Sequence, residues 1–159
     1  MKQTTLSKWL KLITLGTGIC GIIVCAGIIP MLADAAVKQY PEFSNCRWPW
    51  LILIWTTAVP FFAALVLFWK ISTNIGTDRS FSTENARLLK WIAILAASFS
   101  CIFFSGNLIY WLIGMNHPGI ILVSLLIDFL GIVASVAASV LSHLVVKAAE
   151  LQDQSDLTI

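Results

Sequence analysis

Four long apolar stretches constrain the fold of this chain more than any other feature of its sequence. They cover about residues 10–31, 48–71, 88–114 and 119–146. A helix needs roughly 20 mostly apolar residues, at about 1.5 Å of rise each, to cross the hydrocarbon of a bilayer. Because unpaired backbone groups are not tolerated in hydrocarbon, each stretch is predicted to be a transmembrane helix rather than an isolated strand.

The composition excludes a water-soluble globular protein. Hydrophobic residues make up 58% of the 159-residue chain and charged residues only 11%, and the mean hydropathy is +0.88. Too few polar side chains remain to cover a soluble surface. We therefore predict an all-α integral membrane four-helix bundle, formed as a single domain over residues 1–159, of which residues 147–159 are a short tail.

The distribution of basic residues predicts the orientation. Eight of the ten lysine and arginine residues fall on the side that carries both chain ends, whereas Lys38 and Arg47 fall on the other side. Cytoplasmic segments of membrane proteins are enriched in Lys and Arg, so both termini are predicted to be cytoplasmic. Six of the seven tryptophans lie near predicted span ends, where an amphipathic ring is favoured. Trp55 lies deeper and is predicted to serve in packing.

One acidic residue, Asp128, lies in the middle of the fourth apolar stretch. A charged aspartate at the centre of a membrane helix costs about 2.5–3.5 kcal/mol, so Asp128 is predicted to face other helices rather than lipid. A very short turn joins the third and fourth stretches, which makes them antiparallel neighbours. Asn107 and Asp128 each lie about ten residues from this turn and therefore at similar depth. Asn107 is the predicted hydrogen-bonding partner of Asp128.

Small and polar residues of the fourth stretch recur at intervals of three and four, which predicts one helix face directed at a neighbour. The members of this polar stripe are Ser124, Asp128, Gly131, Ser135, Ala138 and Ser142. Two interpretations of Asp128 stay open. One is a structural hydrogen bond with Asn107, worth about 0.6–2 kcal/mol in a membrane. The other is a site that senses or couples protons or cations.

The sequence contains no pattern typical of an enzyme or a metal site. His117 and His143 have no Cys, Asp or second His at metal-ligand spacing. No nucleophile with a base, and no close pair of acids, can be assembled at matching membrane depth. We therefore expect no catalysis, no metal and no cofactor. Cys46 is the one cysteine outside the apolar stretches, and a free thiol is predicted there, with a disulfide between two copies as the alternative.

The two segments predicted to be cytoplasmic are the most distinctive parts of the sequence. The connection between the second and third stretches continues from Gly76 as GTDRSFSTENARLLKWIA, and the chain ends from Ala148 as AAELQDQSDLTI. In the first segment, Ser80 or Ser82 is placed to cap the following helix. Glu84 then lies in its first turn, where a negative charge is favourable.

These two segments resemble a bacterial four-pass membrane family known as domain of unknown function 2975. In that family a phenylalanine and an asparagine open the third span, here Phe81 and Asn85, and the chain often closes on an acidic residue followed by Leu-Thr-Ile, here residues 156–159. The resemblance implies a multi-pass protein of the bacterial plasma membrane. It also implies a partner, because members are frequently encoded beside a small Cro-like helix-turn-helix protein.

From these features we expect a non-enzymatic regulatory or scaffolding protein, surrounded by membrane lipid, that binds a small helix-turn-helix transcription regulator and makes no direct contact with nucleic acid. The predicted cytoplasmic partner surface consists of Arg79, Phe81, Glu84, Asn85, Arg87, Glu150, Asp153, Asp156, Leu157 and Ile159. Its acidic, then apolar, tail suits a basic DNA-binding partner. A solvated helix end with no partner is the other interpretation of the tail.

The alternative function is a small transporter or ion-conducting subunit that uses Asp128 as an intramembrane coupling acid. Four spans are few for a monomeric transporter, and the sequence lacks the inverted repeat and paired broken helices that mark such sites. A homo-oligomer would relieve the first difficulty. The small-residue faces of the first and fourth stretches would allow copies to associate.

Overall fold

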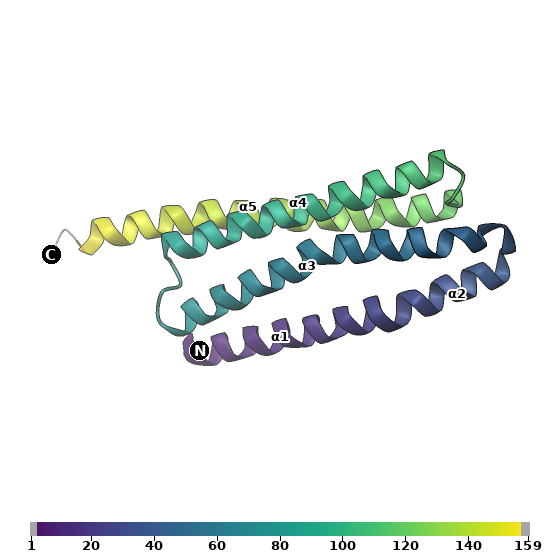
Figure 1. Ribbon diagram of the computed structural model, residues 1–159. Coiled ribbons are helices and arrows are strands. Elements are labelled where there is room, and N and C mark those ends of the chain that lie inside the picture. Colours follow the sequence, from purple (N-terminus) through teal and green to yellow (C-terminus); the bar gives the residue numbers. More distant parts are fainter. Residues whose placement is uncertain (1–2, 157–159) are drawn as a thin grey trace.

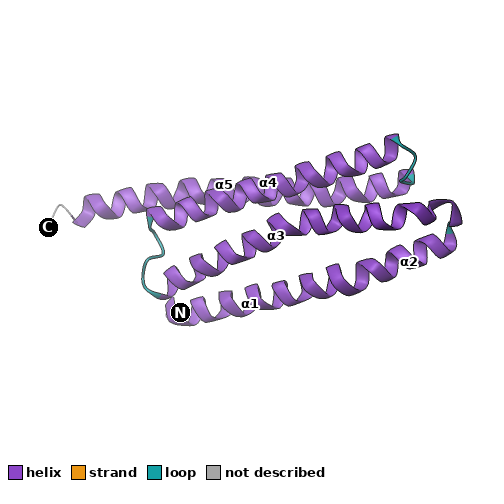
Figure 2. Cartoon of the chain, in the orientation of Figure 1, coloured by secondary structure: helices purple, strands orange, loops and turns teal. Residues whose placement is uncertain are grey.

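The computed structural model describes residues 3–156, and this part of the chain is helical apart from short turns (Figures 1 and 2). Its long helices are α1 (Gln3–Ile23), α2 (Ile29–Gln39), α3 (Arg47–Gly76), α4 (Thr83–Leu112) and α5 (Pro118–Asp156). A π-helical turn, Val24–Ile28, joins α1 to α2, and a 3-10 helix, Pro41–Cys46, joins α2 to α3.

Four helical segments are long and apolar enough to cross a membrane, as the sequence predicts. They are Gln3–Gln39, Pro41–Gly76, Thr83–Leu112 and Pro118–Gln152. Most of these segments extend beyond the predicted apolar stretches, because the polar residues that flank each stretch are also helical. The third span is the exception at its far end: its helix stops at Leu112 rather than at residue 114, where Gly114 adopts a positive φ of 75°. Glycine tolerates this conformation without steric cost.

The spans pack as an open row in which α3 and α4 are the inner members. Backbone contacts pair α1 and α2 with α3, α3 with α4, and α4 with α5, and no other two of these helices make such contact within residues 3–156. Figure 1 shows α3 lying between α1 and α4. The predicted four-helix, all-α architecture is confirmed, and the structure adds that the helices do not enclose one central core.

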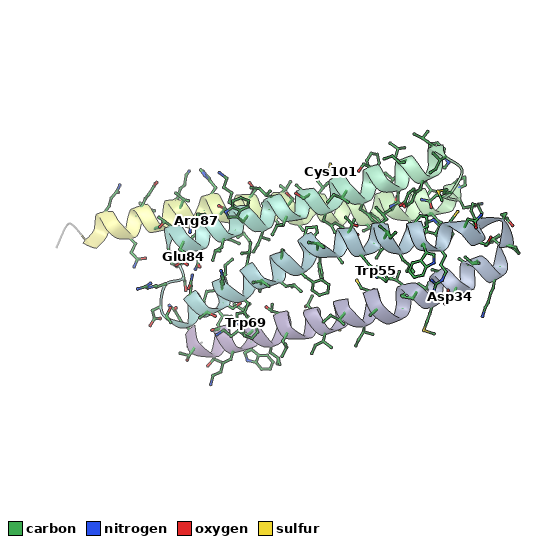
Figure 3. All side chains as sticks on the ribbon, in the orientation of Figure 1. Asp34, Trp55, Trp69, Glu84, Arg87 and Cys101 are labelled. Carbon is green, nitrogen blue, oxygen red and sulfur yellow. The ribbon has the colours of Figure 1, made fainter. Side chains whose placement is uncertain are left out.

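A proline follows the π-helical turn in the first span and leaves one carbonyl of that turn without a helical donor. The N–H of Ile29 bonds the carbonyl of Val24, five residues earlier. In the same register the next donor would be Pro30, which has no N–H. The Cys25 carbonyl would then be unpaired in hydrocarbon, a costly state. The Trp55 indole Nε1 donates to it at 3.1 Å, so Trp55 pairs this backbone group in addition to packing (Figure 3).

The described ends of the chain lie at the same end of the row (Figure 1). There the Ser80 hydroxyl, in the α3–α4 connection, donates to the Gln3 side-chain oxygen at 3.2 Å. We call this end the basic end, because seven basic residues predicted to be cytoplasmic fall in the described part of it: Lys8, Lys11, Lys70, Arg79, Arg87, Lys90 and Lys147. The opposite end, which carries the 3-10 helix and the α4–α5 turn, is called the turn end.

Candidate functional site

Asp128 lies on the face of α5 that packs against α4. Its side chain is 4% exposed, and the prediction that it faces another helix is confirmed. Neither carboxyl oxygen, however, has a hydrogen-bond partner. A buried polar group without a partner is rare in folded proteins and calls for an explanation.

The predicted pair of Asp128 and Asn107 is wrong. The Asn107 amide donates to the Phe103 carbonyl at 2.9 Å, and its side-chain oxygen accepts from the Asn116 amide at 3.1 Å. Equal distance from a turn fixes the depth of two residues but not the helix face on which each lies. Asn107 borders a hollow shared with α2 and α3, which Trp50 also lines, whereas Asp128 lines a separate groove.

This groove has a volume of about 590 Å³ and is lined by α4 and α5 alone. We call it the α4–α5 groove. Its lining includes Ser100, Cys101 and Phe104 from α4, and Leu125, Asp128 and Ile132 from α5. Figure 3 labels Cys101, which marks the α4 wall. The side chains around the carboxyl group are otherwise almost entirely apolar.

The serines of the polar stripe join α5 to α4. The Ser135 hydroxyl donates to the Ala93 carbonyl at 2.8 Å, and the Ser142 hydroxyl donates to the Ala86 carbonyl at 2.7 Å. Ser124 is buried but bonds the Ile121 carbonyl of its own helix. The predicted inward-facing stripe is confirmed, and the hydroxyls of Ser135 and Ser142 join the two helices instead of reaching Asp128.

At the basic end, the connection between α3 and α4 is organised by Asn85. The side-chain amide of Asn85 donates to the carbonyls of Arg79 and Ser80 at 2.9 and 3.1 Å. Its side-chain oxygen accepts from the Asn74 amide at 2.8 Å. Its backbone N–H donates to the Ser82 hydroxyl at 3.2 Å, which makes Ser82, rather than Ser80, the helix cap.

Asn85 therefore does not belong to the predicted partner surface, because it is 1% exposed. A polar side chain in the first turn of a helix is normally solvated, but four backbone and side-chain groups surround this one. The closely spaced Asn74, Ser80, Ser82 and Asn85 were the available signal, since such side chains often bond nearby backbone. The asparagine of the family motif holds the connection in shape.

Other residues of the predicted partner surface are accessible. Arg79, Glu84, Arg87 and Glu150 are exposed, and Phe81 is 59% exposed although it has no polar group (Figure 3 labels Glu84 and Arg87). The α5 backbone continues to Asp156, but the side chains of Asp153 and Asp156 are not described, and Leu157 and Ile159 lie outside the described residues.

A hollow of about 370 Å³ lies beside Phe81 at the basic end. Four helices contribute to it, through Leu6 of α1, Ile75 of α3, Leu89 of α4 and Val145 of α5. It is the place where the first and last spans both approach the α3–α4 connection.

The turn end contains a polar clamp that the sequence analysis missed. The Trp50 indole donates to the Asn116 side-chain oxygen at 2.7 Å, and the Asn116 amide donates onward to Asn107. An ion pair between Arg47 and Asp34 links α3 to α2 nearby. Asn116 stands two residues before the turn proline, and this was the signal in the sequence. The clamp ties α3 and the α4–α5 turn to Asn107 of α4.

The cysteines of the described chain are free, and Cys46 is only 5% exposed. A disulfide between two copies would first require Cys46 to leave this buried position. Within residues 3–156 no three side chains of the His, Cys, Asp or Glu type come together as a metal site.

Comparison with known proteins places the chain among membrane proteins. Residues 31–159 match the family described as "Protein of unknown function (DUF2975)". The chain is also 29% identical, over 153 residues, to a protein of Bacillus subtilis (strain 168) called "Uncharacterized membrane protein YoaS". That alignment covers 95% of this chain and 96% of the relative. No solved structure matches the chain.

Proposed function

Because the chain belongs to the DUF2975 family of multi-pass membrane proteins, we propose that it is a non-enzymatic scaffold that holds a small helix-turn-helix regulator at the bacterial membrane. The docking surface would be the exposed part of the basic end. The family match itself describes no partner, so the support comes from the shape and chemistry of this surface.

The observation that carries the proposal is an exposed aromatic side chain on a connection of fixed shape. Phe81 is 59% exposed, and the residues on either side of it are tied to Asn85 by its two amide hydrogen bonds and by the Ser82 cap. A connection already ordered loses little conformational entropy on binding. Exposed aromatic residues are frequent anchors of protein interfaces.

The projecting end of α5 adds negative charge at the same end of the molecule. Ser142 packs against Ala86, near the start of α4, and α5 continues to Asp156. At 1.5 Å per residue, these last fourteen residues extend about 21 Å farther along the helix axis. Figure 1 shows this end of α5 reaching beyond the start of α4. Its acidic residues would attract a basic DNA-binding domain and guide its approach.

A photo-cross-linking experiment in native membranes tests this function. A photoreactive amino acid would replace Phe81, and in a matched control it would replace Leu112, which is 72% exposed at the turn end. Capture of a helix-turn-helix protein from position 81 but not from position 112 is the expected result. The same set of captured proteins at both positions would contradict the proposal.

Deletion of residues 150–159 tests the tail separately. If the acidic end of α5 guides the regulator, the deletion should lower capture at position 81 and the loss should be greater at low ionic strength, where charges are less screened. Unchanged capture would leave Phe81 as the anchor and remove the tail from the docking surface.

A second candidate function follows from Asp128. An unpartnered carboxyl group inside a membrane is typical of proton and ion pathways. A small transporter would need several copies, because the four spans form an open row that encloses no path of its own. Proton or cation flux into liposomes that is equal for the native protein and Asp128→Asn would reject this candidate.

A further inference from the structure

Neither oxygen of the Asp128 carboxyl group has a hydrogen-bond partner within the described chain. The Ser100 hydroxyl, in the lining of the α4–α5 groove, donates at 3.4 Å to the backbone carbonyl of Asp128 rather than to its carboxyl group. Ser135, the other hydroxyl in the lining of the α4–α5 groove, is bonded to Ala93. A carboxyl group can accept several hydrogen bonds, and burial without any of them is costly. A donor from outside the chain would remove this cost.

The groove is accessible from the lipid side. Several residues of its rim are large, apolar and exposed, among them Leu125 at 46%, Phe129 at 62% and Ile132 at 53%. A molecule that reaches Asp128 by this path must first dissolve in the hydrocarbon of the membrane. It must also carry a polar group that pairs with a carboxyl group.

We propose that the α4–α5 groove binds a lipophilic primary amine, with its ammonium group on Asp128 and its apolar body along Phe104, Leu125 and Ile132. An ammonium group supplies three N–H donors and a charge complementary to a carboxylate. Because the two carboxyl oxygens are almost covered, side chains of the groove must shift to admit any ligand, and a primary ammonium requires a smaller shift than a bulkier cation. A quaternary ammonium is broader and has no N–H to donate. This inference does not rest on the proposed docking function.

The depth of Asp128 separates such an amine from a phospholipid headgroup. Asp128 lies ten residues after Pro118, the first residue of α5, which corresponds to about 15 Å along the helix. This distance places the carboxyl group near the middle of a hydrocarbon layer about 30 Å thick. A phosphate-bearing headgroup remains at the interface, so the expected ligand is an amine without a phosphate.

The experiment uses the full chain in phosphatidylcholine nanodiscs. The probe is a decane chain with a primary ammonium at one end and a dansyl group at the other, and the reference probe has a hydroxyl group in place of the ammonium. We expect the ammonium probe to bind about ten-fold more tightly than the hydroxyl probe, as a charge-assisted hydrogen bond requires. Asp128→Asn should abolish this difference.

Asp34→Asn is the matched control. It removes a carboxylate of α2 outside the groove, so the ten-fold preference for the ammonium probe over the hydroxyl probe should remain. Loss of the preference in this variant would show that the ammonium probe is attracted to negative charge in general. Equal affinity of the native protein for both probes, or a preference that survives in Asp128→Asn, would overturn the proposal. So would displacement of the probe by phosphatidylethanolamine.

A second variant guards against loss of folding in Asp128→Asn. Ile132→Trp keeps the carboxyl group but fills the groove, so it should weaken the binding of both probes. Unchanged binding to Ile132→Trp would overturn the proposal. Light scattering tests whether a second copy occupies the groove instead. If the native protein is a dimer that does not take up the probe, and if Asp128→Asn is a monomer, a second copy is the occupant and the amine proposal is overturned.

Discussion

Asn85 and Asp128 are both buried polar residues in an otherwise apolar chain, but their surroundings differ completely. The side chain of Asn85 donates twice and accepts once, and every partner belongs to the connection or to the end of α3. Both oxygens of Asp128 are without a partner. Asn85 is part of the structure that presents Phe81, whereas the hydrogen-bonding capacity of the Asp128 carboxyl group stays unused within the described chain.

If Asp128 binds a ligand as proposed, the two residues separate a structural from a functional polar group in this membrane protein. Burial alone does not separate them, since Asn85 is 1% exposed and Asp128 is 4% exposed. The count of satisfied donors and acceptors does separate them, because a satisfied group stabilises the fold and an unsatisfied one weakens it. The free energies of unfolding of single-residue variants test this distinction.

The largest expected effect is that of Asn85→Ala. It removes three side-chain hydrogen bonds and leaves the Arg79 and Ser80 carbonyls short of a donor, so the free energy of unfolding should fall by about 3 kcal/mol. Reversible unfolding in mixed detergent micelles measures this change. Thr83→Ala, at an exposed position of the same turn, is the control and should change little. An equal loss in the two variants would show that Asn85 does not organise the connection.

Asp128→Leu should act in the opposite direction. Replacing an unpaired buried carboxyl group with an apolar side chain removes its desolvation cost, so the free energy of unfolding should rise by about 1–2 kcal/mol. The same unfolding assay applies. A decrease comparable to that of Asn85→Ala would mean that Asp128 has structural partners, and the comparison between the two residues would fail.

Trp55→Phe should have an intermediate effect. The change keeps an aromatic ring but removes the donor to the Cys25 carbonyl at the π-helical turn. We expect a loss of about 1 kcal/mol, which is typical of a hydrogen bond between membrane helices. Trp91→Phe, at a position 53% exposed on α4, is the control. Equal stability of the two variants would show that the carbonyl finds another donor.

The smallest effect is expected from Ser142→Ala. Its hydroxyl joins α5 to the Ala86 carbonyl, and a loss of about 0.6 kcal/mol is the average for such bonds in a membrane. Ser98→Ala is a suitable control, because the Ser98 hydroxyl bonds Ile94 within its own helix. If the two serine variants behave alike, the polar stripe contributes through small size and not through hydrogen bonds.

The amino-acid sequence alone predicts the four spans, the antiparallel α4–α5 hairpin and the helix face on which Asp128 lies. Each follows from a one-dimensional property: the length of an apolar stretch, the length of a turn, or the period of an α-helix. The sequence also limits the cap of α4 to Ser80 or Ser82, because a helix cap depends only on residues within about one turn of the helix start.

The identity of the side chains that meet is known only from the packed helices. The partner of Asn107 is Asn116, Asn85 is buried rather than presented, and the spans form an open row. These facts depend on how each helix is rotated about its axis relative to its neighbours. That rotation is set by the packing of many side chains at once, and neither depth nor periodicity along a single helix contains it.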